Sequence, residues 1–453
     1  MPATAKILHE MNDQDYRDRK KAVTPLVIVG ALFLIIGAVS WVNAILIPYF
    51  KIACELTHFE SYFVALVFYI SYFFISLPAG LLLNRIGFKK GIMVALWIMA
   101  LGAFVFIPAA QTRTYGVFLC GLFLIGTGLS VLQTAVNPYV TILGPIERAA
   151  QRISIMGVCN KFAGIIAPLV FAAVVLKPED AQLFQQLPGM MEVQKNAALD
   201  ELIRRVIGPY AVVGAGLFLL GLLVRYSPLP EINTAQESAA VRAANSGKRS
   251  ILQFPHLILG AIAIFVHVGA QILSIDTIIS YAGSMGIDLV AAKRFPSYTL
   301  FATMIGYGIG ILCIPKIFSQ KTALKCCTLL GFVLSLLVVF TGGRVQLLGY
   351  TADSSIWFLA ALGFANSLIW AGIWPLAIEG LGRFTKVGAA VLIMGLVGNA
   401  LMPVLYGYFA ETIGLKAAYW ILIPCFIYLI FYAFYGHKIR RWHYAKAPKD
   451  YKR

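Results

Sequence analysis

The amino-acid sequence predicts an all-α polytopic membrane protein with twelve transmembrane helices in two six-helix bundles. Of its 453 residues, 60% are hydrophobic and only 13% carry a charge, whereas a soluble domain carries about 25% charged residues. The hydrophobic residues form long continuous runs, which indicate helices, because a membrane β-barrel shows short alternating segments instead. Basic residues stand in the short segments between these runs.

Twelve apolar runs are long enough to span a bilayer, which takes roughly 17–25 residues. They cover residues 24–50, 61–83, 91–110, 115–143, 153–176, 206–224, 253–283, 296–315, 326–343, 354–378, 387–410 and 417–436. The run 326–343 is the shortest. Lys161 interrupts the fifth run and Asp276 interrupts the seventh.

The distribution of charge predicts the topology. Lys and Arg gather at the N-terminus, in the loops after the even-numbered spans and in the C-terminal tail. This is the pattern of cytoplasmic segments beside anionic lipid, so we expect both termini in the cytoplasm and the protein in the cell inner membrane. The net charge of +17 therefore does not indicate a nucleic-acid partner. The polar first 23 residues do not resemble a cleavable signal peptide.

The longest expected cytoplasmic connection, 226–252, divides the chain into two halves. We expect an N-terminal six-helix bundle at 1–225 and a C-terminal one at 253–453. Two prolines in each half, Pro138 and Pro168 against Pro375 and Pro403, weakly support a duplication. Paired bundles of this kind place a binding site at mid-membrane between the halves.

The sequence does not favour an enzyme. Seven Cys and six His are scattered, with neither a disulfide framework nor the spacing of metal ligands. The spans carry no paired carboxylates and no activated nucleophile. We therefore expect no metal and no cofactor.

Polar side chains cluster in the stretch Leu132–Pro145, which closes a charge-free run. Gln133 and Asn137 lie four residues apart, so they share one face of a helix. Polar groups in such a stretch need partners. We interpret this face as the lining of a water-accessible path, although interhelical hydrogen bonds worth about 0.6–2 kcal/mol would explain it too.

Several segments resemble a known family. Residues 80–90 resemble the loop motif of the major facilitator superfamily, although Asn84 stands where that motif usually has Asp. Three further segments, 43–48, 132–145 and 152–164, resemble the fucose permease and glucose/galactose transporter family within it. The resemblance implies the major facilitator fold and cation-coupled sugar uptake. The fucose branch carries an Asp at the position of Ala44 and a Glu at that of Gln133, so its route of proton coupling does not carry over.

The resemblance makes the buried amides candidates for sugar contact, because an amide both donates and accepts hydrogen bonds. Gln133, Asn137, Asn160 and Asn43 are the candidates in the first half. Lys161 is the strongest candidate. Placing a lysine at mid-span costs at least about 2.5–3.5 kcal/mol of insertion free energy, so its charge should be paired. Asp276 is the expected partner and Glu379 the alternative. One interpretation is an ion pair that holds the two halves in one state. The other is a lysine that binds sugar or carries the coupling proton, because desolvation can lower a lysine pKa.

The second half offers its own candidates. His267, Gln271 and Ser274 share a face of the seventh span, while Asp276 falls on the opposite side, so either the helix breaks there or Asp276 serves another interface. Asn366, Trp370 and Trp374 repeat at spacing four in the tenth span. An aromatic plane stacks against a hexose and an amide bonds its hydroxyls, although Trp at membrane depth often only packs. Asn399 in the eleventh span is a weaker candidate.

These observations predict a secondary active transporter, which imports a glucose- or galactose-like hexose across the cytoplasmic membrane by alternating access. Coupling to H⁺ or Na⁺ is expected. An uncoupled facilitator, or a transporter of fucose or N-acetylglucosamine, is the alternative, and a non-transporting sugar sensor is a remote one. The expected partners are the sugar and the lipid bilayer, and the expected state is a monomer.

Overall fold

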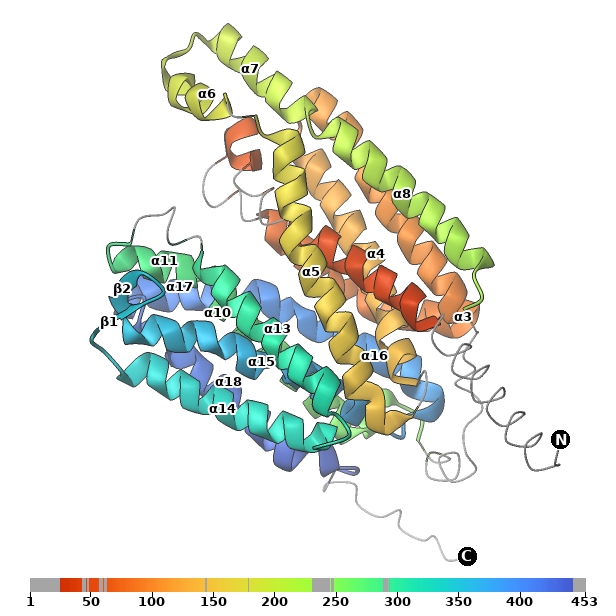
Figure 1. The fold of residues 1–453 in the computed structure, drawn as a ribbon. Coiled ribbons are helices and arrows are strands. Elements are labelled where there is room, and N and C mark those ends of the chain that lie inside the picture. The colour runs from red at the N-terminus through yellow and green to blue at the C-terminus, as the bar shows by residue number, and fades with distance from the viewer. Residues whose placement is uncertain are drawn as a thin grey trace, which may run out of the picture. The chain divides into compact units, whose positions relative to one another are not determined.

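The computed structural model describes residues 25–42, 46, 49–56, 60, 63–142, 145–177, 179–229, 245, 248–287, 292 and 294–442. The described residues are nearly all helical (Figure 1). The chain divides into two compact units, residues 1–232 and 233–453. The division falls within the expected connection 226–252, of which residues 230–244, 246 and 247 lie outside the described part.

Long apolar helices make up most of the first unit. They are the run Pro25–Val42, α3 (Phe63–Thr112), α4 (Tyr115–Ile142), α5 (Ala149–Val175) and α8 (Ile207–Tyr226). Between α5 and α8 stand the short helices α6 (Asp180–Gln186) and α7 (Glu192–Arg204). Single 3₁₀ turns occupy η1 (Ile146–Arg148) and η2 (Leu187–Gly189).

Helix α3 contains two predicted spans. Its 50 residues are broken at Gly87, whose φ of 82° and ψ of 173° are not helical. A positive φ is open to glycine because it has no Cβ. Each side of the break is long enough to cross a bilayer. Among the described residues eleven helices are long and apolar enough to span a membrane, and the break at Gly87 gives these helices the twelve predicted crossings.

A buried arginine closes the end of α4. The guanidinium of Arg152 donates hydrogen bonds to the backbone carbonyls of Val140 at 2.9 Å, Thr141 at 2.8 Å and Pro145 at 2.9 Å. The last carbonyls of a helix lack partners within it, and a cation there also suits the helix dipole. Arg152 thus ties the start of α5 to the end of α4.

The segment 177–205 is ordered by ion pairs at one end of the first unit. Arg205 pairs with Asp180 at 2.8 Å, and Arg113 at the end of α3 pairs with Asp200 of α7 at 3.2 Å. Lys195 also pairs with Glu55. These contacts hold α7 beside the end of α3, so the segment forms a helical cap on these spans.

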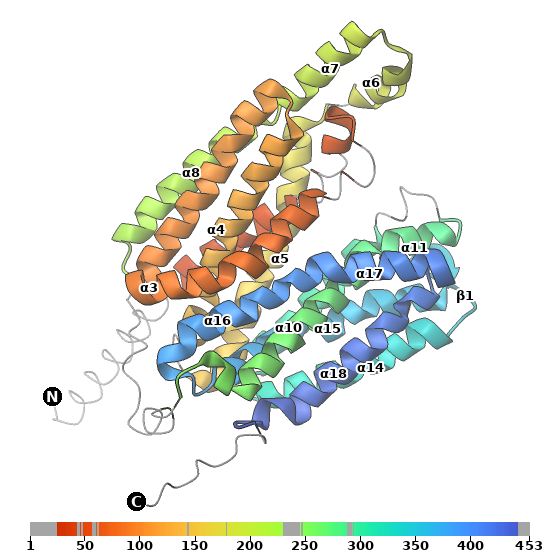
Figure 2. The same ribbon diagram turned by 180° about the vertical axis from the view of Figure 1, so that it is seen from behind.

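The second unit contains the remaining spans (Figure 2). Its helices are α10 (Pro255–Asp276), α11 (Ile278–Ser284), α13 (Phe295–Cys313), α14 (Gln320–Phe340), α15 (Ser354–Ile378), α16 (Thr385–Met394), α17 (Gly398–Ile413) and α18 (Leu422–Phe434). Short 3₁₀ segments occupy η3 (Ile251–Gln253), η4 (Gly382–Phe384), η5 (Gly395–Val397), η6 (Ala417–Ile421) and η7 (Gly436–Lys438). A hairpin of β1 (Arg344–Leu347) and β2 (Tyr350–Asp353) joins α14 to α15, with Arg344 opposite Asp353.

Close helix packing in the second unit depends on glycine. A Cβ added at Gly363 of α15 would lie 2.0 Å from the backbone oxygen of Thr299 in α13, and one at Gly306 would lie 2.0 Å from Oγ of Ser367. Membrane helices approach closely through such small residues, because lipid leaves little hydrophobic drive between them. The pairing of α13 with α15 therefore fixes which face α15 turns to its other neighbours.

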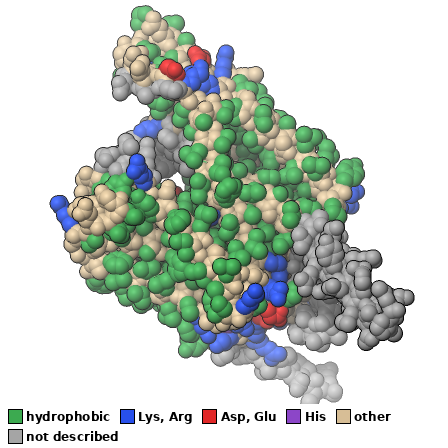
Figure 3. Space-filling view, viewed as in Figure 1, with side chains coloured by type: hydrophobic (Ala, Val, Ile, Leu, Met, Phe, Trp, Pro, Cys, Tyr) green, Lys and Arg blue, Asp and Glu red, His purple; other side chains and the backbone are tan. Residues whose placement is uncertain are grey.

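The surface of each unit matches a membrane protein. On the face in Figure 3 hydrophobic side chains cover the spans, and the Lys, Arg, Asp and Glu side chains gather near the helix ends. Val170, Val174 and Val212 are 57%, 60% and 73% exposed, which in water would be costly but in lipid is not. The protein is therefore a multi-pass membrane protein.

Candidate functional site

The amides of the fourth span are joined to the second span. Gln133 donates from Nε2 to the hydroxyl of Tyr72 at 3.1 Å, and Asn137 donates from Nδ2 to the backbone oxygen of Gln133 at 2.9 Å. The hydroxyl of Tyr72 is also hydrogen bonded to Ser40 of the first span. Asn137 and Tyr72 are buried, whereas Gln133 is half-buried. Of the two amides, Gln133 is thus the one with an accessible surface.

Lys161 lies against an aromatic ring of the first span. Its Nζ is 4.5 Å from the ring centroid of Trp41, and the residue is only 5% exposed. A cation over an indole face gains about 0.5–2 kcal/mol, more where both groups are desolvated. The ring also packs on α5, because a Cβ added at Gly164 would lie 2.5 Å from it. The lysine charge is thereby held between the first and fifth spans.

Asn160 holds the same two spans together one residue earlier. Its Nδ2 donates to the backbone oxygen of Phe33 at 3.4 Å, and a Cβ added at Gly37 would lie 2.2 Å from the oxygen of Asn160. Because Trp41 follows Ser40, a continuous set of contacts joins the polar residues of this unit. We call this set the polar cluster of the first unit; its members are Ser40, Trp41, Tyr72, Gln133, Asn137, Asn160 and Lys161.

In the second unit most of the candidates belong to α10 and α15, which pack directly against each other. A Cβ added at Gly260 of α10 would lie 2.8 Å from the Cβ of Ala377 in α15. The two helices are antiparallel, because α10 is the seventh span and α15 is the tenth, and successive spans cross the membrane in opposite directions. Two turns from this contact bring His267 level with Trp370, and three turns bring Gln271 level with Asn366. From this spacing we expect these four residues to lie near one another.

Two residues of α15 carry buried polar atoms that lack partners among the described residues. Both side-chain atoms of Asn366 and Nε1 of Trp374 meet no hydrogen-bond partner within the described part of the chain, and both residues are 0% exposed. Trp370 is half-buried and stacks on Trp374, with ring centroids 5.4 Å apart and planes at 22°. Buried polar groups are usually satisfied, so an unpaired amide calls for a functional explanation.

The remaining candidates are placed as follows. Asp276 is exposed and is the last residue of α10, since the helix is interrupted at Thr277 before α11 begins. Thr277 shares a hydrogen bond of 2.7 Å with the hydroxyl of Tyr419. Asn399 is half-buried near the start of α17. Asn43 lies outside the described residues. Lys161 and Asp276 belong to different units, so their pairing stays a prediction.

Sequence reasoning missed Trp41 and Tyr72. Aromatic residues are frequent in membrane spans, so residue type alone does not separate these two from the rest. A usable signal was their position: Trp41 follows the polar Ser40, and Tyr72 follows Ser71 within an apolar run. Glu379 follows the end of α15 and pairs with Arg440 at 2.6 Å, which gives it a partner other than Lys161.

The fold and these polar residues define a polytopic helical membrane protein with hydrogen-bonding groups sunk in its spans. Residues 28–391 match the model of the Major Facilitator Superfamily, and the chain belongs to that family.

Named relatives and a solved structure agree with this assignment. The chain is 32% identical to a glucose/galactose transporter of Brucella abortus, over 90% of this chain and 92% of that protein. It is 30% identical to the L-fucose-proton symporter of Escherichia coli K12, over 93% and 95%. A crystal structure of the superfamily transporter FucP in the outward conformation superposes with a TM-score of 0.78 at 28% identity. That match covers 91% of this chain and 98% of FucP.

Proposed function

We propose that the protein is a secondary active transporter, which imports a glucose- or galactose-like hexose across the cell inner membrane by alternating access. Relatives that match over nine-tenths of the chain are named as transporters of glucose and galactose and of fucose. Both units carry polar side chains within their spans, which suits a sugar, because each hydroxyl group needs both donors and acceptors.

The polar cluster of the first unit carries this proposal. Gln133 and Asn160 are half-buried amides that offer a donor and an acceptor each, and Trp41 offers an aromatic face beside them. Tyr72 orients Gln133 through its hydroxyl. Such fixed orientation lowers the entropy lost on binding. Gln133, Asn137, Asn160 and Lys161 are the proposed sugar-site residues of this unit, together with Asn43.

Gln271, Asn366, Trp370, Trp374 and Asn399 are the proposed sugar-site residues of the second unit. The half-buried Trp370 supplies a plane for the C–H face of a hexose, and Trp374 backs it by stacking. The unpaired amide of Asn366 is ready to bond a hydroxyl group when a sugar or water reaches it. An unpaired buried amide costs about 1–3 kcal/mol of stability. Hydrogen bonds to a bound sugar would recover this free energy.

Coupling is proposed to use Lys161 and Asp276. Lys161 is a buried cation of the spans, and a proton there or a cation at Asp276 would link the transport steps to an H⁺ or Na⁺ gradient. Uncoupled transport is the second candidate, because the chain has Ala44 and Gln133 where the fucose-permease branch carries acids.

We further propose that the units act as two bundles, 1–225 and 253–453, joined by the connection 226–252. The basic loops support cytoplasmic positions for both termini. We propose a monomer, since each chain contains both halves of the transport machinery.

Uptake into proteoliposomes tests the proposed function. We expect saturable uptake of labelled galactose or glucose, with competition from the unlabelled sugar. Parallel vesicles with a pH gradient, a Na⁺ gradient or neither decide the coupling ion. An absence of saturable uptake for every hexose, fucose and N-acetylglucosamine would refute the proposal, whereas equal uptake with and without gradients would favour the facilitator.

A further inference from the structure

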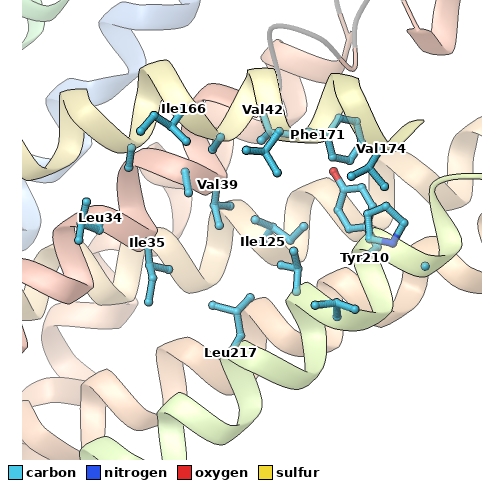
Figure 4. Close-up of a pocket in the computed structure, with 18 of the residues that line it drawn as sticks. Leu34, Ile35, Val39, Val42, Ile125, Ile166, Phe171, Val174, Tyr210 and Leu217 are labelled. Atoms are coloured by element: carbon cyan, nitrogen blue, oxygen red, sulfur yellow. The ribbon is translucent and has the colours of Figure 1, made fainter. Parts of the chain in front are cut away.

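A cavity of the first unit is apolar and cannot serve a sugar. It holds about 810 Å³ between the first span, α4, α5 and α8, and none of its lining residues is charged. Figure 4 shows Val39 of the first span, Ile166 of α5 and Tyr210 of α8 turned towards one space. A hexose there would lose its hydrogen bonds to water without replacement.

The cavity has the depth of one lipid leaflet. Along α5 its lining extends from Phe162 to Val174, which is roughly 18 Å of helix. One leaflet of the hydrocarbon core is about 15 Å deep. Along α8 it covers Gly208 to Leu217, the first half of that helix. Both stretches lie at the helix ends next to α6 and α7, so one leaflet accounts for the whole cavity.

The cavity opens onto the surface that faces lipid. Val170, Val174 and Val212 line it and are 57%, 60% and 73% exposed. They are continuous with exposed apolar side chains such as Leu169 and Leu219, which are 65% and 58% exposed. A lipid acyl chain that enters this space laterally from the bilayer therefore meets no polar barrier.

Basic side chains stand at the outer end of the cavity. Lys177 follows Val174 by three residues, and its side chain is 57% exposed, with Glu201 3.8 Å away. Arg204 precedes Gly208 by four residues and is exposed. A phosphodiester is the anion that Lys and Arg bind well at the headgroup level of a bilayer.

We propose that this cavity is a phospholipid site, in which one acyl chain fills the space between the first span, α5 and α8 and the phosphate lies by Lys177 and Arg204. The same helices carry the polar cluster on their other faces. Ala38 and Val39 of the cavity precede Ser40 and Trp41, and Phe162 follows Lys161. The bound acyl chain thus supports the packing that holds Trp41 against Lys161.

Native mass spectrometry of the full chain, released from nanodiscs of phosphatidylglycerol and phosphatidylethanolamine, tests the proposal. We expect one phospholipid retained per wild-type chain. Ala167→Phe fills the cavity and should reduce retention at least about fivefold, as overpacking excludes the chain. Ala173→Phe is the matched control on the same helix outside the lining, and it should retain the lipid. Ala38→Phe, from the first span, repeats the test should Ala167→Phe not fold.

A thermal-stability assay supplies an independent readout. In delipidated wild type, added phospholipid should raise Tm and diacylglycerol, which lacks the phosphate, should raise it less. In Ala167→Phe and in Ala38→Phe, added phospholipid should not raise Tm. Equal lipid retention in wild type and filled variants, retention of an isoprenoid instead, or an equal response to diacylglycerol would overturn the proposal. These readouts need no sugar, so they fail or succeed separately from the proposed transport.

Discussion

Nζ of Lys161 lies 4.5 Å from the ring centroid of Trp41, and this contact joins the fifth span to the first. Lys161 directly follows Asn160, and from Ser40, the residue before Trp41, hydrogen bonds lead through the hydroxyl of Tyr72 to Gln133. Both spans belong to the first unit, so the contact lies within one bundle, beside the amides proposed for the sugar site.

Replacing Lys161 with Met should remove coupling. The variant keeps an apolar stem but loses the cation, so uptake should no longer respond to a pH or Na⁺ gradient. Sugar counterflow should persist with a raised KM, because Lys161 is also a proposed sugar-site residue. Lys195→Met in α7 is the control, because Lys195 lies outside the polar cluster and pairs with Glu55. Gradient-driven uptake that is unchanged in Lys161→Met would exclude this lysine from coupling.

Tyr72→Phe should weaken sugar affinity without unfolding the protein. It removes the hydroxyl that accepts from Gln133 and leaves that amide free to rotate. A lost hydrogen bond of about 1 kcal/mol raises KM roughly fivefold, measured by initial uptake rates. Tyr408→Phe, at a residue 62% exposed, should leave KM unchanged. If both variants behave alike, Tyr72 does not orient Gln133.

Asn366→Leu should separate stability from transport. The two side-chain atoms of Asn366 lack partners in the described structure, so an apolar residue of similar volume should raise the unfolding free energy by about 1–2 kcal/mol. Transport should fall sharply, since the amide that would bond the sugar is gone. Denaturation in mixed micelles and uptake assays measure the two effects. Loss of stability with normal uptake would make Asn366 a structural residue.

Arg152→Gln should destabilise the first unit. The guanidinium donates two hydrogen bonds to carbonyls at the end of α4 and a third to the carbonyl of Pro145, and glutamine cannot replace all of them. We expect a loss of about 3 kcal/mol in the unfolding free energy. Arg148→Gln, at an exposed neighbour, should change it by less than about 0.5 kcal/mol. Similar losses of unfolding free energy in Arg152→Gln and Arg148→Gln would show that the hydrogen bonds of Arg152 contribute little to stability.

Asp353 should make the second unit sensitive to acid. It caps α15 by accepting from the backbone N–H of Ser355 at 2.9 Å and pairs with Lys416 at 3.4 Å. Burial raises its pKa, but the hydrogen bonds of Ser355 and the charge of Lys416 outweigh this, so the pKa lies below the ordinary 3.8. Its contribution is therefore complete above pH 3.8 and is lost as the pH falls through the lowered pKa.

Two substitutions divide the role of Asp353. Asp353→Asn keeps the cap but loses the charge and should cost less than about 1 kcal/mol. Asp353→Ala loses both and should cost about 1–2 kcal/mol. Chemical denaturation at neutral pH measures the two values. Equal losses would mean that the ion pair, and not the cap, holds the start of α15.

The course of the chain through the membrane was predictable where charge and hydropathy change together. The expected run 354–378 coincides with α15, Ser354–Ile378. The run 326–343 was placed too late, because α14 begins at Gln320, where the side chain of Ser319 accepts from the N–H of Thr322. Lys325 inside α14 lies over the ring of Phe434. A lysine that extends along an aromatic residue does not end a helix, although it ends an apolar run.

The candidate site was predictable only within single helices. The four-residue spacing of Gln133 and Asn137 is visible in the sequence, but the hydroxyl of Tyr72 that joins them to the second span is not. Asp276 is still within α10 and is exposed, on the side opposite His267 as regular helix spacing gives, and the helix is interrupted only after it, at Thr277. Contacts between helices depend on packing, and hydropathy carries no information on which polar residue faces which.

Binding of galactose to the purified protein, followed through tryptophan fluorescence and calorimetry, tests the role of the polar cluster most directly. We expect saturable binding by wild type and at least about tenfold weaker binding by Gln133→Leu and Asn160→Leu. Asn245→Leu should leave binding unchanged, because the Asn245 side chain donates to the backbone oxygen of Gly380, away from the polar cluster. Equal affinity in wild type and both cluster variants would contradict a sugar site built on these amides.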